Sequence, residues 1–378
     1  MGRFGILLLA SIPIAAAVLL VSSSQPLKAP LWTNSRITEL DRDRSVLRGL
    51  EFIYASASKP KQFEAFGDDF LWCFYSLSAA ASDPELKKRA LRMGRERAKE
   101  WRKANSSVPL EANADAIANL AFGSLSADLL DVRDPGMKTE LRTAALLHKP
   151  EEYFQFNPTL EPPPNDIPID CAKCKSSNPR GSKVCRKCAA ELRMTDPYDI
   201  LCDALITAYI GNRYGVTLGG SYEDVAQWIP KMRPYPRHNK DDLRPTYGAD
   251  YAITHIVYTL NDYTLYKLRP EWLPQEYEYL KTNLRANIAM SDAETLGEYM
   301  DALRSFGMDE SDPIMRAGVE FLLAHQNPDG SWGDVREADP YVRYHATWTS
   351  MNGIMQYAWR GERVSSPEAL RRIHAGDR

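Results

Sequence analysis

The most specific chemical signal in the sequence is a set of regularly spaced cysteines. Cys171 and Cys174 form one C-x2-C pair, and Cys185 and Cys188 form a second pair ten residues later. Each C-x2-C turn directs two thiolates toward one point, and Zn²⁺ prefers such ligands in a tetrahedral arrangement. Residues 178–181 can reverse the chain between the pairs, and the surrounding lysines and arginines favour thiolates. We predict one structural zinc ion, with two disulfides in an oxidising compartment as the alternative.

A second set of residues could carry acid–base chemistry. In residues 246–266, aromatic and polar side chains recur at steps of three or four, so Tyr251 and His255 share one helix face, with Asp250 beside it. Such a face needs hydrogen-bond partners, which a wet cavity supplies. His345 lies in another helical segment and could reach the same cavity. We predict His345, His255, Asp250 and Tyr251 as catalytic residues, with a second metal ion at His255 and His345 as an alternative.

Structural or surface roles are expected for other charged residues. Asp68 and Asp69 precede an apolar run and are expected to cap its helix, with cavity-facing acids as the alternative. Glu298 and Asp301 lie three residues apart on one helical segment and are expected to be solvated surface charges. His238 is expected in a solvated loop, with a ligand at a cavity rim as the alternative.

The elements that must position these residues are helices. Apolar residues recur at helical spacing in residues 37–56, and residues 66–81 are almost wholly apolar. Outside the cysteine segment, no alternating run is long enough to predict a strand. We therefore predict an all-α fold, in which residues 35–160 and 194–378 form two parts of one helical domain. Residues 161–193 form an inserted zinc ribbon with a proline-rich lead-in.

The N-terminal segment predicts a membrane or export signal. Residues 4–21 are uncharged and long enough to cross a bilayer. We predict a signal anchor or signal peptide over residues 1–24 and a linker over residues 25–34. The protein would then be membrane-anchored by a single N-terminal pass, or secreted or periplasmic if the segment is cleaved. With a net charge of -3, nothing indicates a nucleic-acid partner.

Two local patterns resemble known families. The cysteine segment resembles zinc ribbons, because N-P-x-G occurs between the pairs, Val184 precedes the third cysteine, and Leu192 follows the fourth. Gln326, Gly330 and Trp332 resemble the Q-x-x-x-G-x-W repeat of the terpenoid cyclase and protein prenyltransferase superfamily. That resemblance implies an α/α toroid of about six helix pairs, in which this motif is structural and the glutamine amide meets backbone groups at a helix end.

The next helical segment carries a further resemblance. The sequence YHATW, which includes His345, resembles the Y-H-T-x-Y helix of prenyltransferase β-subunits, where the histidine binds catalytic zinc. The chain departs from that family because it has no D-x-C pair for the other zinc ligands. The D-x-D-D motif of squalene–hopene-type cyclases is also absent.

Together these patterns predict a membrane-anchored α/α-toroid enzyme acting on an apolar or isoprenoid-like substrate. The 19 Tyr and 8 Trp suit an aromatic central cavity. The resemblance implies a lyase, isomerase or transferase. One alternative is a non-catalytic, membrane-associated scaffold whose toroid and ribbon contact a protein partner. Another is a glycan-processing α/α-toroid enzyme that uses paired carboxylates.

Overall fold

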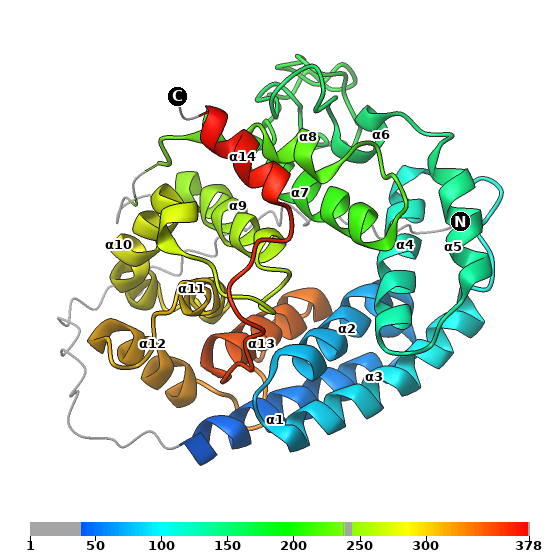
Figure 1. Cartoon of the computed structure of the whole chain (residues 1–378). Coiled ribbons are helices and arrows are strands. Elements are labelled where there is room, and N and C mark those ends of the chain that lie inside the picture. The colour runs from blue at the N-terminus through cyan, green and yellow to red at the C-terminus, as the bar shows by residue number, and fades with distance from the viewer. Residues whose placement is uncertain (1–38, 237, 239–243, 377–378) are drawn as a thin grey trace.

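The computed structural model describes residues 39–236, 238 and 244–376 (Figure 1). Every regular element among these residues is a helix, which confirms the predicted all-α class for this part of the chain. The α-helices are α1 (Glu39–Ala57), α2 (Pro60–Ala80), α3 (Pro84–Ala104), α4 (Ala114–Leu129), α5 (Pro135–Ala145), α6 (Pro150–Phe154), α7 (Pro197–Tyr214), α8 (Tyr222–Ala226), α9 (Arg244–Leu260), α10 (Pro274–Met290), α11 (Ala293–Ser305), α12 (Pro313–Ala324), α13 (Pro340–Ile354) and α14 (Pro367–Gly376). Two short 3₁₀ helices are η1 (Ile229–Met232) and η2 (Pro270–Trp272).

Many helices begin at an Asp-Pro pair. The aspartate carboxylate accepts a hydrogen bond from a backbone N–H of the first turn, where no carbonyl of the helix can reach. Proline fits the next position because it has no N–H to satisfy and its φ is already helical. The N-cap aspartates of α3, α5, α7, α12 and α13 are Asp83, Asp134, Asp196, Asp312 and Asp339.

The helices pack in an ordered series (Figure 1). Along the set α2, α4, α7, α9, α11 and α13, each helix contacts the next, and α13 in turn contacts α2. The remaining long helices pack against members of this set: α1 against α13 and α2, α3 against α2 and α4, and α10 against α9 and α11. We call the six helices of the first set the inner helices.

Small residues bring α11 and α13 unusually close. A Cβ atom added to Gly297 would lie 2.4 Å from the backbone carbonyl of Thr349, which is far inside van der Waals contact. Gly353 faces the Gly297 backbone at the next turn of α13. These glycines therefore permit the contact that sets the register of two inner helices.

The Gln326 motif ties α1 to the turn between α12 and α13. The Gln326 amide donates to the Ser45 carbonyl at 2.8 Å and to the Gly330 carbonyl at 3.0 Å. The Trp332 indole donates to the Leu322 carbonyl in the last turn of α12. The Gln326 amide thus binds one carbonyl in α1 and one in its own turn. The Trp332 indole, and not the glutamine, binds a free carbonyl at the end of α12.

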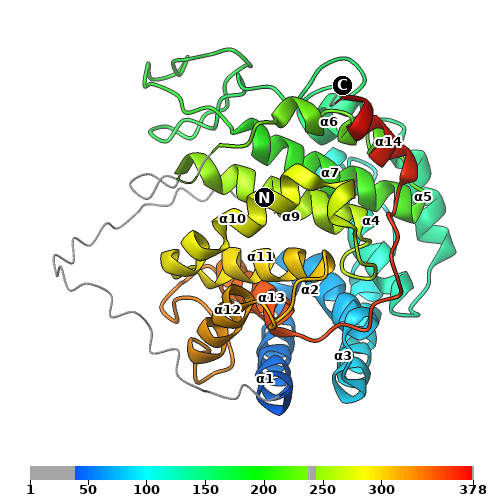
Figure 2. The ribbon, with the colours of Figure 1, turned by 60° about the vertical axis from the view of Figure 1, so that its left-hand side comes forward.

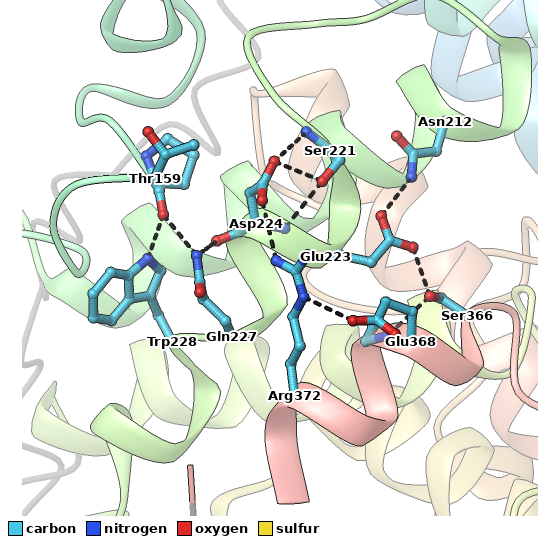
Figure 3. A network of polar contacts seen from close by, with 12 residues as sticks. Thr159, Asn212, Ser221, Glu223, Asp224, Gln227, Trp228, Ser366, Glu368 and Arg372 are labelled. Atoms are coloured by element: carbon cyan, nitrogen blue, oxygen red, sulfur yellow. Dashed lines mark hydrogen bonds and ion pairs between the residues drawn. The ribbon is translucent and has the colours of Figure 1, made fainter. Parts of the chain in front are cut away.

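The C-terminal helix α14 is attached through α8 (Figure 3). Arg372 on α14 pairs with Asp224 on α8 at 3.1 Å. Immediately after α8, Gln227 and Trp228 both donate to the Pro158 carbonyl, at 3.0 and 2.7 Å. One short helix therefore holds both the C-terminal segment and the start of the chain that leads to the cysteines.

The predicted ribbon, residues 161–193, lies between α6 and α7. Within it and beside it the chain forms isolated antiparallel bridges, Pro168 with Met194 and Val184 with Glu191, and no helix. This segment lies at one end of the molecule, outside the helical body (Figure 2). The predicted anchor, residues 1–24, and the linker, residues 25–34, lie outside the described residues. None of the helices that the structure describes is long and apolar enough to cross a membrane.

Candidate active site and metal site

The cysteines predicted to bind metal come together in space. The Sγ atoms of Cys171, Cys174, Cys185 and Cys188 all lie within 4.8 Å of one another. The Cys171–Cys188 distance is 3.5 Å and the Cys174–Cys185 distance is 3.6 Å. Ligands about 2.3 Å from a tetrahedral zinc ion lie roughly 3.8 Å apart, whereas a disulfide needs about 2.05 Å. This cluster could therefore hold a metal ion such as zinc.

The two cysteine turns share one backbone geometry. The Cys171 carbonyl accepts from the Lys175 N–H at 2.7 Å, and the Cys185 carbonyl accepts from the Ala189 N–H at 2.8 Å. Lys175 and Ala189 both adopt the left-handed conformation, with φ of 56° and 55°. Repetition of the same turn presents each pair of thiols in the same way to a shared point.

A serine between the pairs supports the thiolate form. The Ser176 hydroxyl lies 3.0 Å from the Cys174 sulfur and 3.2 Å from the Cys185 sulfur. Its hydrogen bond is the largest influence on Cys185 and lowers the pKa of that thiol to about 5. Sequence reasoning assigned this role to the surrounding lysines and missed Ser176, which is adjacent to the first pair.

A separate cavity of about 90 Å³ lies among the inner helices. Each of them contributes to its wall, together with the turn that follows α9. A single water molecule needs about 10–15 Å³ by this measure, so there is space for several waters or for part of a larger ligand. Its aromatic wall consists of Trp72, Phe122, Tyr258, Tyr263, Tyr341 and Trp348.

Both predicted histidines line this cavity, and His345 is positively charged. His345 on α13 donates from Nδ1 to a Glu294 carboxylate oxygen at 2.9 Å, and its ring stacks on Tyr341. Burial lowers the pKa of His345, but the charge and hydrogen bond of Glu294 outweigh burial and raise it to about 9. His345 is therefore an imidazolium at neutral pH, with a second N–H at Nε2.

The second histidine is in the opposite state. His255 on α9 lies 2.8 Å from the Tyr251 backbone carbonyl through Nδ1. A carbonyl only accepts hydrogen bonds, so Nδ1 must carry the proton. Burial is the main cause that lowers the pKa of His255, to about 4. The ring is neutral at physiological pH, and Nε2 holds a lone pair.

Tyr251 links the two histidines. Its hydroxyl donates to the Glu294 oxygen that holds His345, at 2.9 Å, while its backbone carbonyl holds His255. The structure thus brings Tyr251, His255 and His345 together, as their pattern predicted. Glu294, the residue that completes the arrangement, was missed by sequence reasoning.

Asp250, expected beside His255, points elsewhere. Its carboxylate accepts from the Tyr299 and Tyr279 hydroxyls at 2.5 and 2.9 Å and from His238 at 3.0 Å. Consecutive residues on a helix are rotated by about 100°, so Asp250 and Tyr251 face different neighbours. The expectation of a solvated His238 is also wrong, because its side chain is only 5% exposed against Asp250.

The expectation that Glu298 and Asp301 are surface charges is wrong. Both are buried on α11 and line the cavity. Burial is the largest influence on each carboxyl and raises the pKa of Glu298 to about 8 and of Asp301 to about 7. Glu298 accepts a hydrogen bond from Thr254 and lies 4.0 Å from His255. The polar face of α11 therefore faces an internal space and not solvent.

Asp68 and Asp69 follow a kink inside α2. Phe66 has non-helical backbone angles, so the two aspartates lie in the first turn of the apolar second half of the helix, where Asp68 accepts hydrogen bonds from backbone N–H groups. Asp69 lines the cavity and accepts from the Tyr344 hydroxyl at 2.6 Å. Its cavity-facing position corresponds to the alternative that the sequence left open.

The predicted second metal site lacks ligands. Among the described residues, the cysteine cluster is the one group of three or more His, Cys, Asp or Glu side chains close enough to share an ion.

Comparison of the chain with protein-family models, with curated proteins and with solved structures found no match.

Proposed function

We propose that this protein is an acid–base enzyme that acts on an apolar, isoprenoid-like substrate in the cavity among the inner helices. One observation carries the proposal: two histidines in opposite protonation states line the same aromatic cavity. Where the environment pushes the pKa values of two neighbouring groups apart, one group can act as the base and the other as the acid. His255 is the base and His345 is the acid.

The proton transfers balance without an external reagent. The His255 lone pair at Nε2 removes a proton from a substrate carbon, and the released electron pair shifts within the substrate. The His345 N–H gives a proton to the substrate oxygen that receives charge or leaves as water. No electron enters or leaves the system, so the reaction classes are isomerisation and elimination.

A transferase that ionises a diphosphate is less well supported. A diphosphate needs several cations or a metal to hold its charge. No lysine or arginine is among the residues that line the cavity, whereas Asp69, Glu298 and Asp301 are. Apart from His345, the wall therefore offers no cation to hold such a ligand.

We further propose that the helices form an α/α toroid. The support is the series of contacts among the inner helices, which begins and ends at α2, with other helices packed outside them. In this architecture the cavity occupies the hub, which explains why each inner helix contributes to its wall.

The cysteine cluster is proposed to bind one structural zinc ion. All four ligand positions are supplied by protein, which leaves no open position for a substrate. Residues 4–21 are proposed to anchor the enzyme at a membrane, where a lipidic substrate is concentrated. If they are cleaved, the enzyme is secreted or periplasmic.

The test is proton exchange with solvent. Full-length protein is incubated in D₂O with geraniol, citral, farnesol and squalene, and the recovered compounds are analysed by mass spectrometry. We expect deuterium uptake or a new product from at least one compound. The rate should fall about 100-fold or more in His255→Ala and in His345→Gln, since positioned acid–base groups contribute this much.

His325→Ala is the matched control, because His325 is exposed and stacks on Phe321 away from the cavity. Its rate should equal that of the wild type. Absence of exchange with all four compounds, or equal rates in the two cavity variants and the control, would reject the proposal.

Glycan processing is the second candidate, because Asp69 on α2 and Glu298 on α11 place carboxyls from two helices in one cavity. Such catalysis needs one ionised carboxylate opposite one acid. Burial raises the pKa of both groups, so neither carboxyl is favoured as the ionised partner that this catalysis needs. Release of nitrophenol from p-nitrophenyl glycosides, lost in Glu298→Gln, would support this candidate instead.

A further inference from the structure

The cysteine segment concentrates positive charge in one small part of the molecule. Residues 171–193 contain seven lysines and arginines and a single acid, Glu191, whereas the whole chain has a net charge of -3. Four thiolates and one Zn²⁺ together carry a charge of about -2, so the segment stays positive when the proposed metal is bound. The rest of the chain is correspondingly acidic.

Most of these cations have no anionic partner within the protein. Arg180 is the exception, because it pairs with Glu161 at 2.7 Å and with Asp166 at 2.6 Å. The other six side chains are exposed, and none of them forms an ion pair with any residue that the structure describes. We call these six residues the ribbon cations: Lys173, Lys175, Lys183, Arg186, Lys187 and Arg193.

The cysteine cluster holds the ribbon cations near one another. Lys173 and Lys175 flank one cysteine of the cluster, and Arg186 and Lys187 lie between two others. The four sulfur atoms lie within 4.8 Å of one another, so the backbone positions next to them are also close together. Like charges held at such short range repel one another, and an anionic partner offsets that repulsion.

Exposed apolar side chains lie beside these charges. Val184, in the same segment, is 56% exposed, and Leu160, in its lead-in, is 77% exposed. Leu160 adjoins Glu161, which the ion pair with Arg180 holds against the segment. Lysine and arginine beside exposed apolar side chains are typical of surfaces that bind the headgroup region of a bilayer, because the cations contact anionic headgroups while the apolar groups enter the acyl boundary.

The sequence also gives a reason for a bilayer to be nearby. Residues 4–21 are the proposed anchor, and residues 22–38 separate them from the start of α1. A fully extended chain of that length spans at most about 60 Å, whereas a domain of this size is roughly 50 Å across. The ribbon, which lies at one end of the molecule (Figure 2), is therefore within reach of the same bilayer.

A nucleic-acid partner fits the same segment less well. Residues 171–193 contain no aromatic side chain on which an unpaired base could stack. They also contain no helix that could enter a major groove.

We propose that the ribbon cations dock the protein onto the anionic phospholipid headgroups of the membrane that holds its N-terminal segment. The proposal rests on the proposed anchor and is independent of the acid–base chemistry. Each lysine or arginine close to an anionic surface strengthens binding about fivefold, and a tether makes this contact intramolecular. Docking fixes which end of the helical body faces the bilayer.

The experiment measures protection of the ribbon lysines by lipid. Full-length protein is reconstituted into vesicles of phosphatidylcholine, or of phosphatidylcholine mixed with phosphatidylglycerol, neither of which has an amine. A membrane-impermeant, amine-reactive acetylating reagent is added, and labelling of each lysine is measured by mass spectrometry. We expect the ribbon lysines to be labelled about fivefold or more slowly in the anionic vesicles. The exposed lysines Lys88 and Lys99 on α3, away from the ribbon (Figures 1 and 2), should be labelled equally in both.

Salt tests whether charge causes the protection. The Debye length falls from about 10 Å at 0.1 M salt to about 3 Å at 1 M salt, so exposed charges are screened at the higher concentration. Labelling of the ribbon lysines should then become equal in the two kinds of vesicle.

Variants assign the protection to the ribbon cations, with Lys183 as the labelled reporter. Protection of Lys183 should be lost when four of the other ribbon cations are replaced together, by Lys173→Gln, Lys175→Gln, Arg186→Gln and Lys187→Gln. The matched control removes four exposed cations from α2 and α3, by Lys61→Gln, Lys88→Gln, Arg92→Gln and Lys99→Gln, and should keep it.

Zinc content and urea unfolding check that each variant is folded. If the ribbon variant loses zinc, Lys183→Gln with Arg193→Gln replaces it, because neither residue adjoins a cysteine. Lys173 is then the reporter, and its protection should be reduced.

The outcomes separate the docking from the anchor. A chain that floats with the vesicles but whose ribbon lysines are labelled equally with both lipids would overturn the docking alone. Protection that persists at 1 M salt, or stronger protection by a short single-stranded DNA than by anionic vesicles at 0.1 M salt, would also overturn it. A chain that floats with neither kind of vesicle would reject the anchor and the docking together, and the acid–base proposal would stand.

Discussion

Glu298 allows a direct test of the buried cavity wall, through the substitution Glu298→Gln. Burial raises the pKa of Glu298 from 4.5 to about 8. The carboxyl is therefore neutral in the folded protein over a pH range in which it is ionised in the unfolded chain. Glutamine has nearly the same shape and is neutral at every pH, so the variant lacks only this pH dependence.

The sign follows from proton binding. A carboxyl whose pKa is raised in the folded protein binds more protons there than in the unfolded chain. Its contribution to the free energy of unfolding is therefore fully present below pH 4.5 and is lost as the pH rises through 8. One pKa unit corresponds to about 1.4 kcal/mol. Between about pH 5 and about pH 8 the wild type should therefore lose on the order of 4 kcal/mol relative to Glu298→Gln.

The assay is urea unfolding of both proteins at a series of pH values, with the free energy of unfolding extrapolated to water. Glu294→Gln is the matched control on the same helix, because the His345 charge lowers the pKa of Glu294 despite burial. Its difference from wild type should have the opposite sign: the variant is less stable at neutral pH, and the deficit shrinks as the pH falls. A Glu298→Gln difference that does not change with pH would refute the burial argument.

Other predictions follow from the same geometry. Histidine NMR should place the pKa of His345 near 9 and that of His255 near 4, and Glu294→Gln should lower the His345 value because the partner charge is removed. Elemental analysis should find one zinc per chain, and Cys185→Ser should lose it, since the other thiolates cannot complete a tetrahedron. Gly297→Ala should destabilise the protein by about 1–3 kcal/mol or more in thermal unfolding, because its Cβ would lie 2.4 Å from the α13 backbone.

The parts of the structure that depend on local chemistry could be predicted from the sequence. The Asp-Pro pairs mark helix starts because the cap and the proline act within a single turn. The cysteine spacing predicts a cluster because each pair is held by its own turn and only one chain reversal is needed. Neither prediction required knowledge of what lies far away in the sequence.

The buried acids could not be placed by the same reasoning. Helical spacing shows that Glu294, Glu298 and Asp301 share a face of α11, but it does not show what that face contacts. Charged residues at such spacing usually face water, whereas here Glu298 and Asp301 face a cavity closed by helices distant in sequence. The available signal was a stripe of three acids on one face of α11, which resembles the tyrosine and histidine stripe on α9.

Tyr251 explains why the acid and the base must be considered as one unit. Its hydroxyl and its carbonyl belong to the same residue, so the position of Glu294, and through it of His345, is linked to the position of His255. The two imidazoles also influence each other directly, because the charge on His345 further lowers the pKa of His255. Protonation of one ring therefore opposes protonation of the other, and at neutral pH the His345 ring is charged while the His255 ring is neutral. A reaction that both removes and returns a proton requires one group in each state.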